Sequence, residues 1–178
     1  MELVIDIYQR IRAIERALRD VIIPAIDPQR ANAVEQAGYC LRHLNLMATQ
    51  CQWEYPFVLA ELRDFLELTR TLQGIAGERL PAAVHEQAKR AEAAATGLAA
   101  IRLPGMAAVS QAVTGLREAA DGLLKAALDA GPEAGRAAGA AVVDTARRRE
   151  IREGAWIQGQ GYDSAQGAGP DIAGALEF

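Results

Sequence analysis

Residues 34–53 have the sequence VEQAGYCLRHLNLMATQCQW, in which apolar or small side chains recur at alternating spacings of three and four. This first row contains Val34, Ala37, Leu41, Leu44, Ala48 and Cys51. At about 100° per residue, a second row lies on the opposite side of the same helix. It contains Tyr39, Leu46 and Trp53, seven residues apart. Two apolar rows predict that this helix is buried all round or that its second row faces a partner.

The same helical spacing continues along the chain and predicts an all-α fold. The first helix carries a row made of Val4, Ile7, Ile11, Ile14, Leu18 and Val21 and is predicted to end at Pro24. Asp27 is the predicted N-cap of the second helix, with Pro28 at its first position. Further rows follow over residues 58–72, 81–102, 106–127 and 133–154. We therefore expect a mostly antiparallel bundle of five to six helices in one domain, residues 1–154.

The C-terminal residues differ in composition from the rest of the chain. Residues 155–178 are rich in Gly, Gln and Ala and show no helical row. They are predicted to form an irregular arm, and Trp156 and Tyr162 are the aromatic residues that we expect to dock it against a groove. Whether that groove belongs to the same chain or to another one stays open at this point.

Composition limits the classes of partner. The net charge of −4 gives no overall attraction to nucleic acid or to an anionic membrane, so neither is predicted as a partner. The excess of 17 Arg over 2 Lys indicates a GC-rich genome rather than a function. No secretory signal is recognisable, and the longest span without a charged residue, Leu103 to Leu116, is too short to cross a bilayer.

The two cysteines indicate a reducing compartment. Cys40 and Cys51 are eleven residues apart in one predicted helix, which places them about 16 Å apart along its axis, too far for a disulfide. A cytoplasmic protein is therefore expected.

Three polar residues of the second helix are candidates for chemistry. Glu35, Tyr39 and His43 follow one another at intervals of four, so they lie on one side of the helix and are candidate catalytic residues for proton transfer. Arg42 and Cys40 are candidate ligand-binding residues beside them. The alternative is structural: Tyr39 packs, while the carboxylate and the imidazole bond to neighbours or reach solvent.

Metal and cofactor sites are not predicted. Cys40 and His43 have the spacing of a metal-binding pair, but the chain has no second Cys/His pair. The sequence HEQAK at residues 85–89 lacks the second histidine of a zinc protease helix, and GQGYDS at residues 159–164 lacks the third glycine of a dinucleotide loop. Neither serine lies in a GxSxG motif.

Charged residues elsewhere are predicted to be solvated. The basic run ARRREIRE, residues 146–153, is interpreted as a set of cations at a helix C-terminus, where they interact favourably with the helix dipole. Glu61, Asp64 and Glu67 are interpreted as a solvated side of the third helix.

Two hypotheses about function follow from these patterns. The preferred one is a non-catalytic interaction or accessory protein, a homodimer or a partner of another protein, that joins through Tyr39, Leu46 and Trp53 or through the arm. The alternative is a helical-bundle enzyme or small-ligand binder whose pocket lies beside the second helix and uses His43 as acid, base or ligand.

Overall fold

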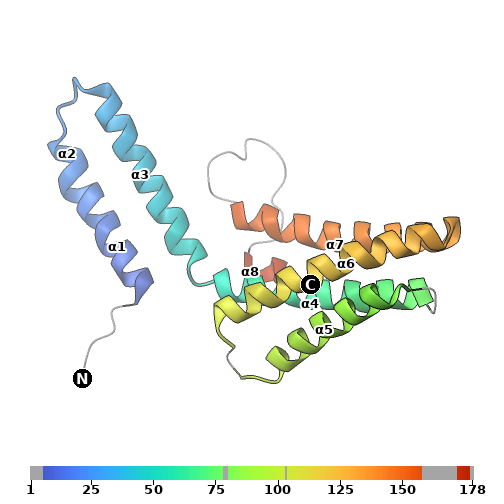
Figure 1. Cartoon of the computed structure of the whole chain (residues 1–178). Helices are drawn as coiled ribbons and strands as arrows, with labels where there is room; N and C mark the ends of the chain where they lie inside the picture. Colours follow the sequence, from blue (N-terminus) through green and yellow to red (C-terminus); the bar gives the residue numbers. More distant parts are fainter. Residues whose placement is uncertain (1–5, 78–79, 103, 158–171, 177–178) are drawn as a thin grey trace. The chain divides into compact units, whose positions relative to one another are not determined.

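The computed structural model describes residues 6–77, 80–102, 104–157 and 172–176, and these residues are almost entirely helical (Figure 1). No strand occurs among them, so the predicted all-α fold is confirmed. The chain divides into two compact units, one made of Met1–Glu54 and Gly154–Ala173, the other of Tyr55–Glu153 and Gly174–Phe178. Compactness alone does not test whether the two units fold together, so the single domain over residues 1–154 stays a prediction.

The first unit contains an N-terminal hairpin, by which we mean residues 7–50. Its first arm consists of α1 (Ile7–Ala17), the π-helical segment η1 (Leu18–Ile22) and α2 (Ile23–Ala25). Its second arm is α3 (Ala31–Gln50), which runs antiparallel to the first (Figure 1). The helix that was predicted to end at Pro24 therefore ends one residue later.

The turn of the hairpin differs from the prediction. Asp27 does not cap α3, because its carboxylate accepts a hydrogen bond from the backbone N–H of Gln29 at 3.0 Å. The backbone N–H of Arg30 donates to the carbonyl of Asp27, and α3 begins only at Ala31. Asp27 thus closes an Asx turn, a local bond that competes with helix formation.

The contact between the two arms is small and partly polar. Its buried residues are Ile11 and Glu15 on α1 and Ala37 and Ala48 on α3. Glu15, which is 2% exposed, pairs with Arg12 at 2.5 Å and also with Arg19. Arg12 donates in addition to the side-chain carbonyl of Asn45 on α3 at 3.0 Å. This polar network therefore links the first arm to the second.

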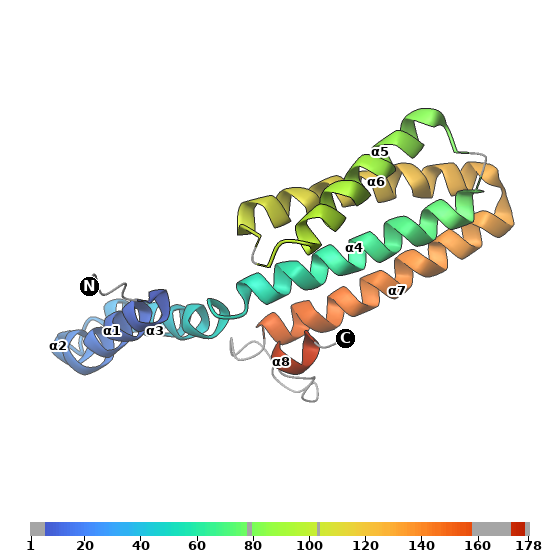
Figure 2. The ribbon, with the colours of Figure 1, turned by 90° about the horizontal axis from the view of Figure 1, so that it is seen from below.

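The second unit is built from four long helices that lie side by side in both views (Figures 1 and 2). They are α4 (Glu54–Ala76), α5 (Ala82–Ala99), α6 (Met106–Ala130) and α7 (Pro132–Ile157). We call residues 55–153 the four-helix unit. Its core is made of Leu, Val and Ala side chains, and the fully buried ones include Leu72, Leu116, Leu123, Ala88 and Ala138. Many of its contacts are alanines, which allow helices to approach closely.

An ion-pair network joins α4 to α7 and corrects two predictions. Asp64 on α4 is only 6% exposed, and its carboxylate accepts from Nε of Arg148 at 3.1 Å and from Nη2 of Arg152. Arg152 is 2% exposed, so it does not serve as a solvated cation at the helix end. Glu61 is half-buried and Glu67 exposed, so the predicted solvated side holds for Glu67 but is wrong for Asp64. The cause is the packing of α7 on α4.

The predicted C-terminal arm lies largely outside the described residues, and this includes Tyr162. At its start the prediction is wrong, because α7 continues to Ile157 and residues 155–157 are helical. Near its end, α8 (Ile172–Ala175) is a single helical turn. No helix in the described part of the chain is long and apolar enough to span a membrane.

Candidate functional site

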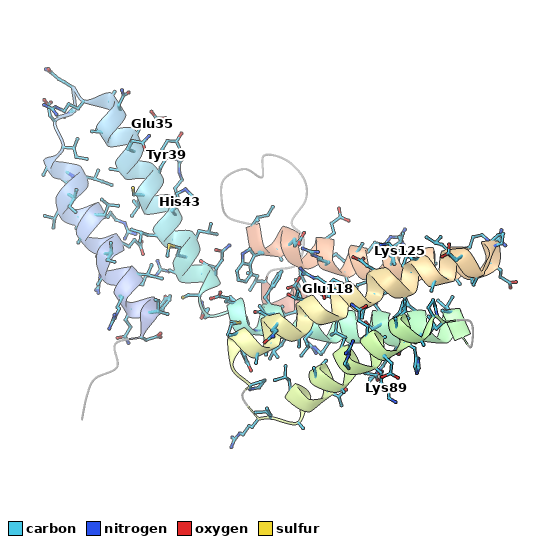
Figure 3. The ribbon with its side chains drawn as sticks, viewed as in Figure 1. Glu35, Tyr39, His43, Lys89, Glu118 and Lys125 are labelled. Atoms are coloured by element: carbon cyan, nitrogen blue, oxygen red, sulfur yellow. The ribbon has the colours of Figure 1, made fainter. Side chains whose placement is uncertain are left out.

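The candidate residues of α3 lie on the side of the helix that is turned away from α1. Figure 3 shows Glu35, Tyr39 and His43 one above the other along this side. All three are exposed, and the Tyr39 hydroxyl donates to Oε1 of Glu35 at 3.2 Å. The Arg42 guanidinium lies over the Tyr39 ring, 4.4 Å from its centroid. The structure therefore brings Glu35, Tyr39 and Arg42 together, as the spacing predicts.

His43 is not joined to this group. His43 is exposed, and among the described residues its imidazole has no hydrogen-bond or ion-pair partner. A carboxylate and an imidazole that both face solvent lack the enclosed surroundings in which acid–base pairs operate. His43 does not line the hollows at Ile75, Tyr8, Ile7 or Pro81, so its pocket hypothesis stays a prediction.

The predicted interface residues are partly accessible. Tyr39 is 39% exposed, while Leu46 and Trp53 are half-buried. Within the described residues α3 buries only Ala37 and Ala48, so the alternative in which this helix is buried all round does not hold there. The sequence could not exclude it, because two apolar rows look the same whether a second helix covers them or not.

Trp156, the remaining candidate interface residue, is half-buried near the end of α7. Its backbone carbonyl accepts a hydrogen bond from the side-chain amide of Gln50 at 3.0 Å, a contact within the first unit. Because α7 continues to Ile157, Trp156 lies in a helix and not in the predicted irregular arm.

Cys40 lies on α3 and Cys51 directly after it. Both are free, Cys40 exposed and Cys51 half-buried. Within the described residues there is no group of three or more His, Cys, Asp or Glu side chains that could hold a metal ion.

The feature that the sequence reasoning missed lies on the first arm of the hairpin. Ile7, Ile14 and Val21 belong to the apolar row that was expected to be covered, yet they are 60%, 56% and 66% exposed. Met47 on α3 is also exposed, and with Ile7, Ile11 and Cys51 it lines a hollow of about 350 Å³. The signal was present in the sequence, since Ile7, Ile14 and Val21 are spaced by seven residues.

Comparison with protein-family models, with curated proteins and with solved structures finds no match for this chain. We therefore infer its function from the geometry of the molecule alone.

Proposed function

We propose that this chain is a non-catalytic interaction or accessory protein that self-associates through its N-terminal hairpin. The observation that carries the proposal is the concentration of exposed apolar side chains there. Of the twelve large hydrophobic side chains exposed in the described part of the chain, seven lie in the hairpin: Ile7, Ile14, Val21, Ile22, Val34, Tyr39 and Met47.

This concentration is unusual for a surface that faces only water. Single exposed hydrophobic residues are normal, whereas contiguous apolar patches of several hundred Å² mark interaction sites. The hairpin also has little interior of its own, since two of its four buried side chains are alanines and a third is Glu15. Covering the exposed side chains would supply the stabilisation that the contact between its arms lacks.

The mass of the intact protein in solution tests the proposal. Multi-angle light scattering from about 1 to 100 μM covers the usual range of homodimer affinities, and we expect the mass to rise toward twice that of one chain. His43→Ala is the control, and it should leave the mass and the helical content unchanged. A chain that stays monomeric over the whole range would refute self-association. Loss of dimer in His43→Ala would assign to this residue a role that the proposal does not include.

A further inference from the structure

The apolar residues of the first arm point in two directions. Ile11 is buried and Leu18 half-buried, so this series faces α3. Ile7, Ile14 and Val21 alternate with them in a heptad pattern but remain more than half exposed. In a heptad pattern both series normally lie in one seam. Here only one series is covered, and the other is displaced to one flank of the contact with α3.

The same flank of α3 is also apolar. Met47 and Cys51 line one hollow together with Ile7, and Ile11, Gln50, Glu54 and Trp156 complete its lining. At the Ile7 end of the first arm, the apolar flank therefore continues to the end of the second arm. We call this surface the apolar side and define it by Ile7, Ile14, Val21, Met47 and Cys51.

The opposite flank of the hairpin is polar. Arg12 bonds there to Glu15 and to Asn45, and Arg19 also pairs with Glu15. A second hollow on α1 is lined by Tyr8, Gln9, Arg12, Glu15, Arg16 and Arg19. The hairpin therefore has one apolar and one charged side, as a pair of helices has when it forms half of a four-helix bundle.

In a four-helix bundle each helix packs against two neighbours along its length. Within the described hairpin each arm packs along its length against the other arm, and only the end of α3 reaches Trp156 of α7. We infer that the apolar side binds the same side of a second copy of the hairpin, so that two chains together complete a four-helix bundle. The inference rests on the proposed self-association and adds to it the surface and the geometry. It assigns the interface to the apolar side and not to Tyr39, Leu46 and Trp53.

The exposed apolar area of the apolar side is large enough for an interface with a second copy of the chain. Four large apolar side chains of the apolar side, Ile7, Ile14, Val21 and Met47, are each more than half exposed. Together they offer on the order of 500 Å² of apolar surface. A standard interface buries about 800 Å² on each partner, of which about 60% is apolar, which is also about 500 Å².

The charge of the hairpin favours the same occupant. The hairpin, residues 7–50, contains six Arg and four Asp or Glu, and the segment Met1–Glu54 that includes it contains six Arg and seven Asp or Glu. The net charge of this segment is therefore −1, which causes little repulsion between two copies. The same balance gives no attraction to an anionic membrane surface. A two-fold arrangement uses the same apolar side on both chains, so every substitution there acts twice in the dimer.

Charge substitutions on the two candidate surfaces separate the inference from the proposed function. We expect Ile14→Glu and Val21→Glu each to raise the dimer dissociation constant roughly 100-fold, because each places two charges in an apolar contact. Leu46→Glu, on the other side of α3, should leave the constant within about threefold of the wild-type value. Val143→Glu is the matched control for Val21→Glu, since Val143 is an exposed valine on α7 of the four-helix unit.

The masses of the wild type and the variants show which of the two hypotheses fails. A wild-type dimer that dissociates with Leu46→Glu but not with Ile14→Glu would overturn the inference and leave the proposed self-association intact. A wild-type monomer would refute both. If a monomer loses stability with Ile14→Glu, the apolar side is covered by its own chain, and the inference is again overturned.

Thiol labelling tests the same surface without a disruptive substitution. In a Cys40→Ser protein, alkylation of Cys51 should be at least about fivefold slower at concentrations where the dimer forms than after dilution, because the apolar side is then covered. The control is Val143→Cys in a chain that lacks both native cysteines, and its rate should not depend on concentration. A rate at Cys51 that stays constant while the mass doubles would overturn the inference even if Ile14→Glu fails to fold.

Discussion

Replacing Asp64 by Ala is expected to lower the free energy of unfolding of the four-helix unit by about 3 to 5 kcal/mol. The substitution removes the carboxylate that accepts from both Arg148 and Arg152. Arg152 is then the decisive residue, because its side chain is 2% exposed and its Nε and Nη1 already lack hydrogen-bond partners among the described residues. Without Asp64 a buried guanidinium keeps its charge but loses its counterion.

The loss is large enough to measure by denaturation. The four-helix unit contains α4, α5, α6 and most of α7, so far-UV circular dichroism follows its unfolding in urea. With a denaturant dependence of about 1 to 3 kcal/mol per molar urea, the midpoint should fall by about 2 M. Trp53 and Trp156 both belong to the first unit, so tryptophan fluorescence follows the other part of the chain.

Two further variants decide whether burial of the charge is the cause. Asp144→Ala removes another carboxylate bound to Arg148, at 2.5 Å, but this side chain is 65% exposed. We expect it to change the free energy of unfolding by less than about 1 kcal/mol. Asp64→Leu combined with Arg152→Met removes both charges and should recover most of the stability. The reasoning is refuted if Asp64→Ala stays within about 1 kcal/mol of wild type, or if the double variant is no more stable than Asp64→Ala.

Two other pairs of substitutions test the interior and one turn of the same unit. Leu123→Ala should cost about 2 to 5 kcal/mol in a urea titration, because Leu123 is fully buried in the core, while Leu128→Ala, exposed on the same helix, should cost less than about 1 kcal/mol. Gly131→Ala should lower the melting temperature, since the φ angle of +131° at this position between α6 and α7 strains any side chain, whereas Gly139→Ala within α7 has open space and should raise it. Equal effects at the two leucines, or at the two glycines, would contradict these explanations.

The candidate site shows which contacts the sequence could predict and which exposures it could not. The spacing of Glu35 and Tyr39 correctly predicted that they meet, because residues four apart on a helix are neighbours in any fold. It did not predict the exposure of Ile14 or Val21. An apolar row indicates that a helix side is suited to burial but not whether this chain or another one covers it.

The positions of the helices follow from properties that act within a few residues, such as apolar spacing and prolines, and were therefore predictable from the chain. Two of their ends were predicted wrongly, because Asp27 closes an Asx turn before α3 and α7 continues to Ile157. Asp64 and Arg152 could not be paired in that way, because they are 88 residues apart and meet only where α7 packs on α4. The same holds for α1, where the packing of α3 covers Ile11 and leaves Ile7 outside. Which side of a helix is covered depends on the position of other helices, and that is set by the sum of many contacts between residues distant in the sequence.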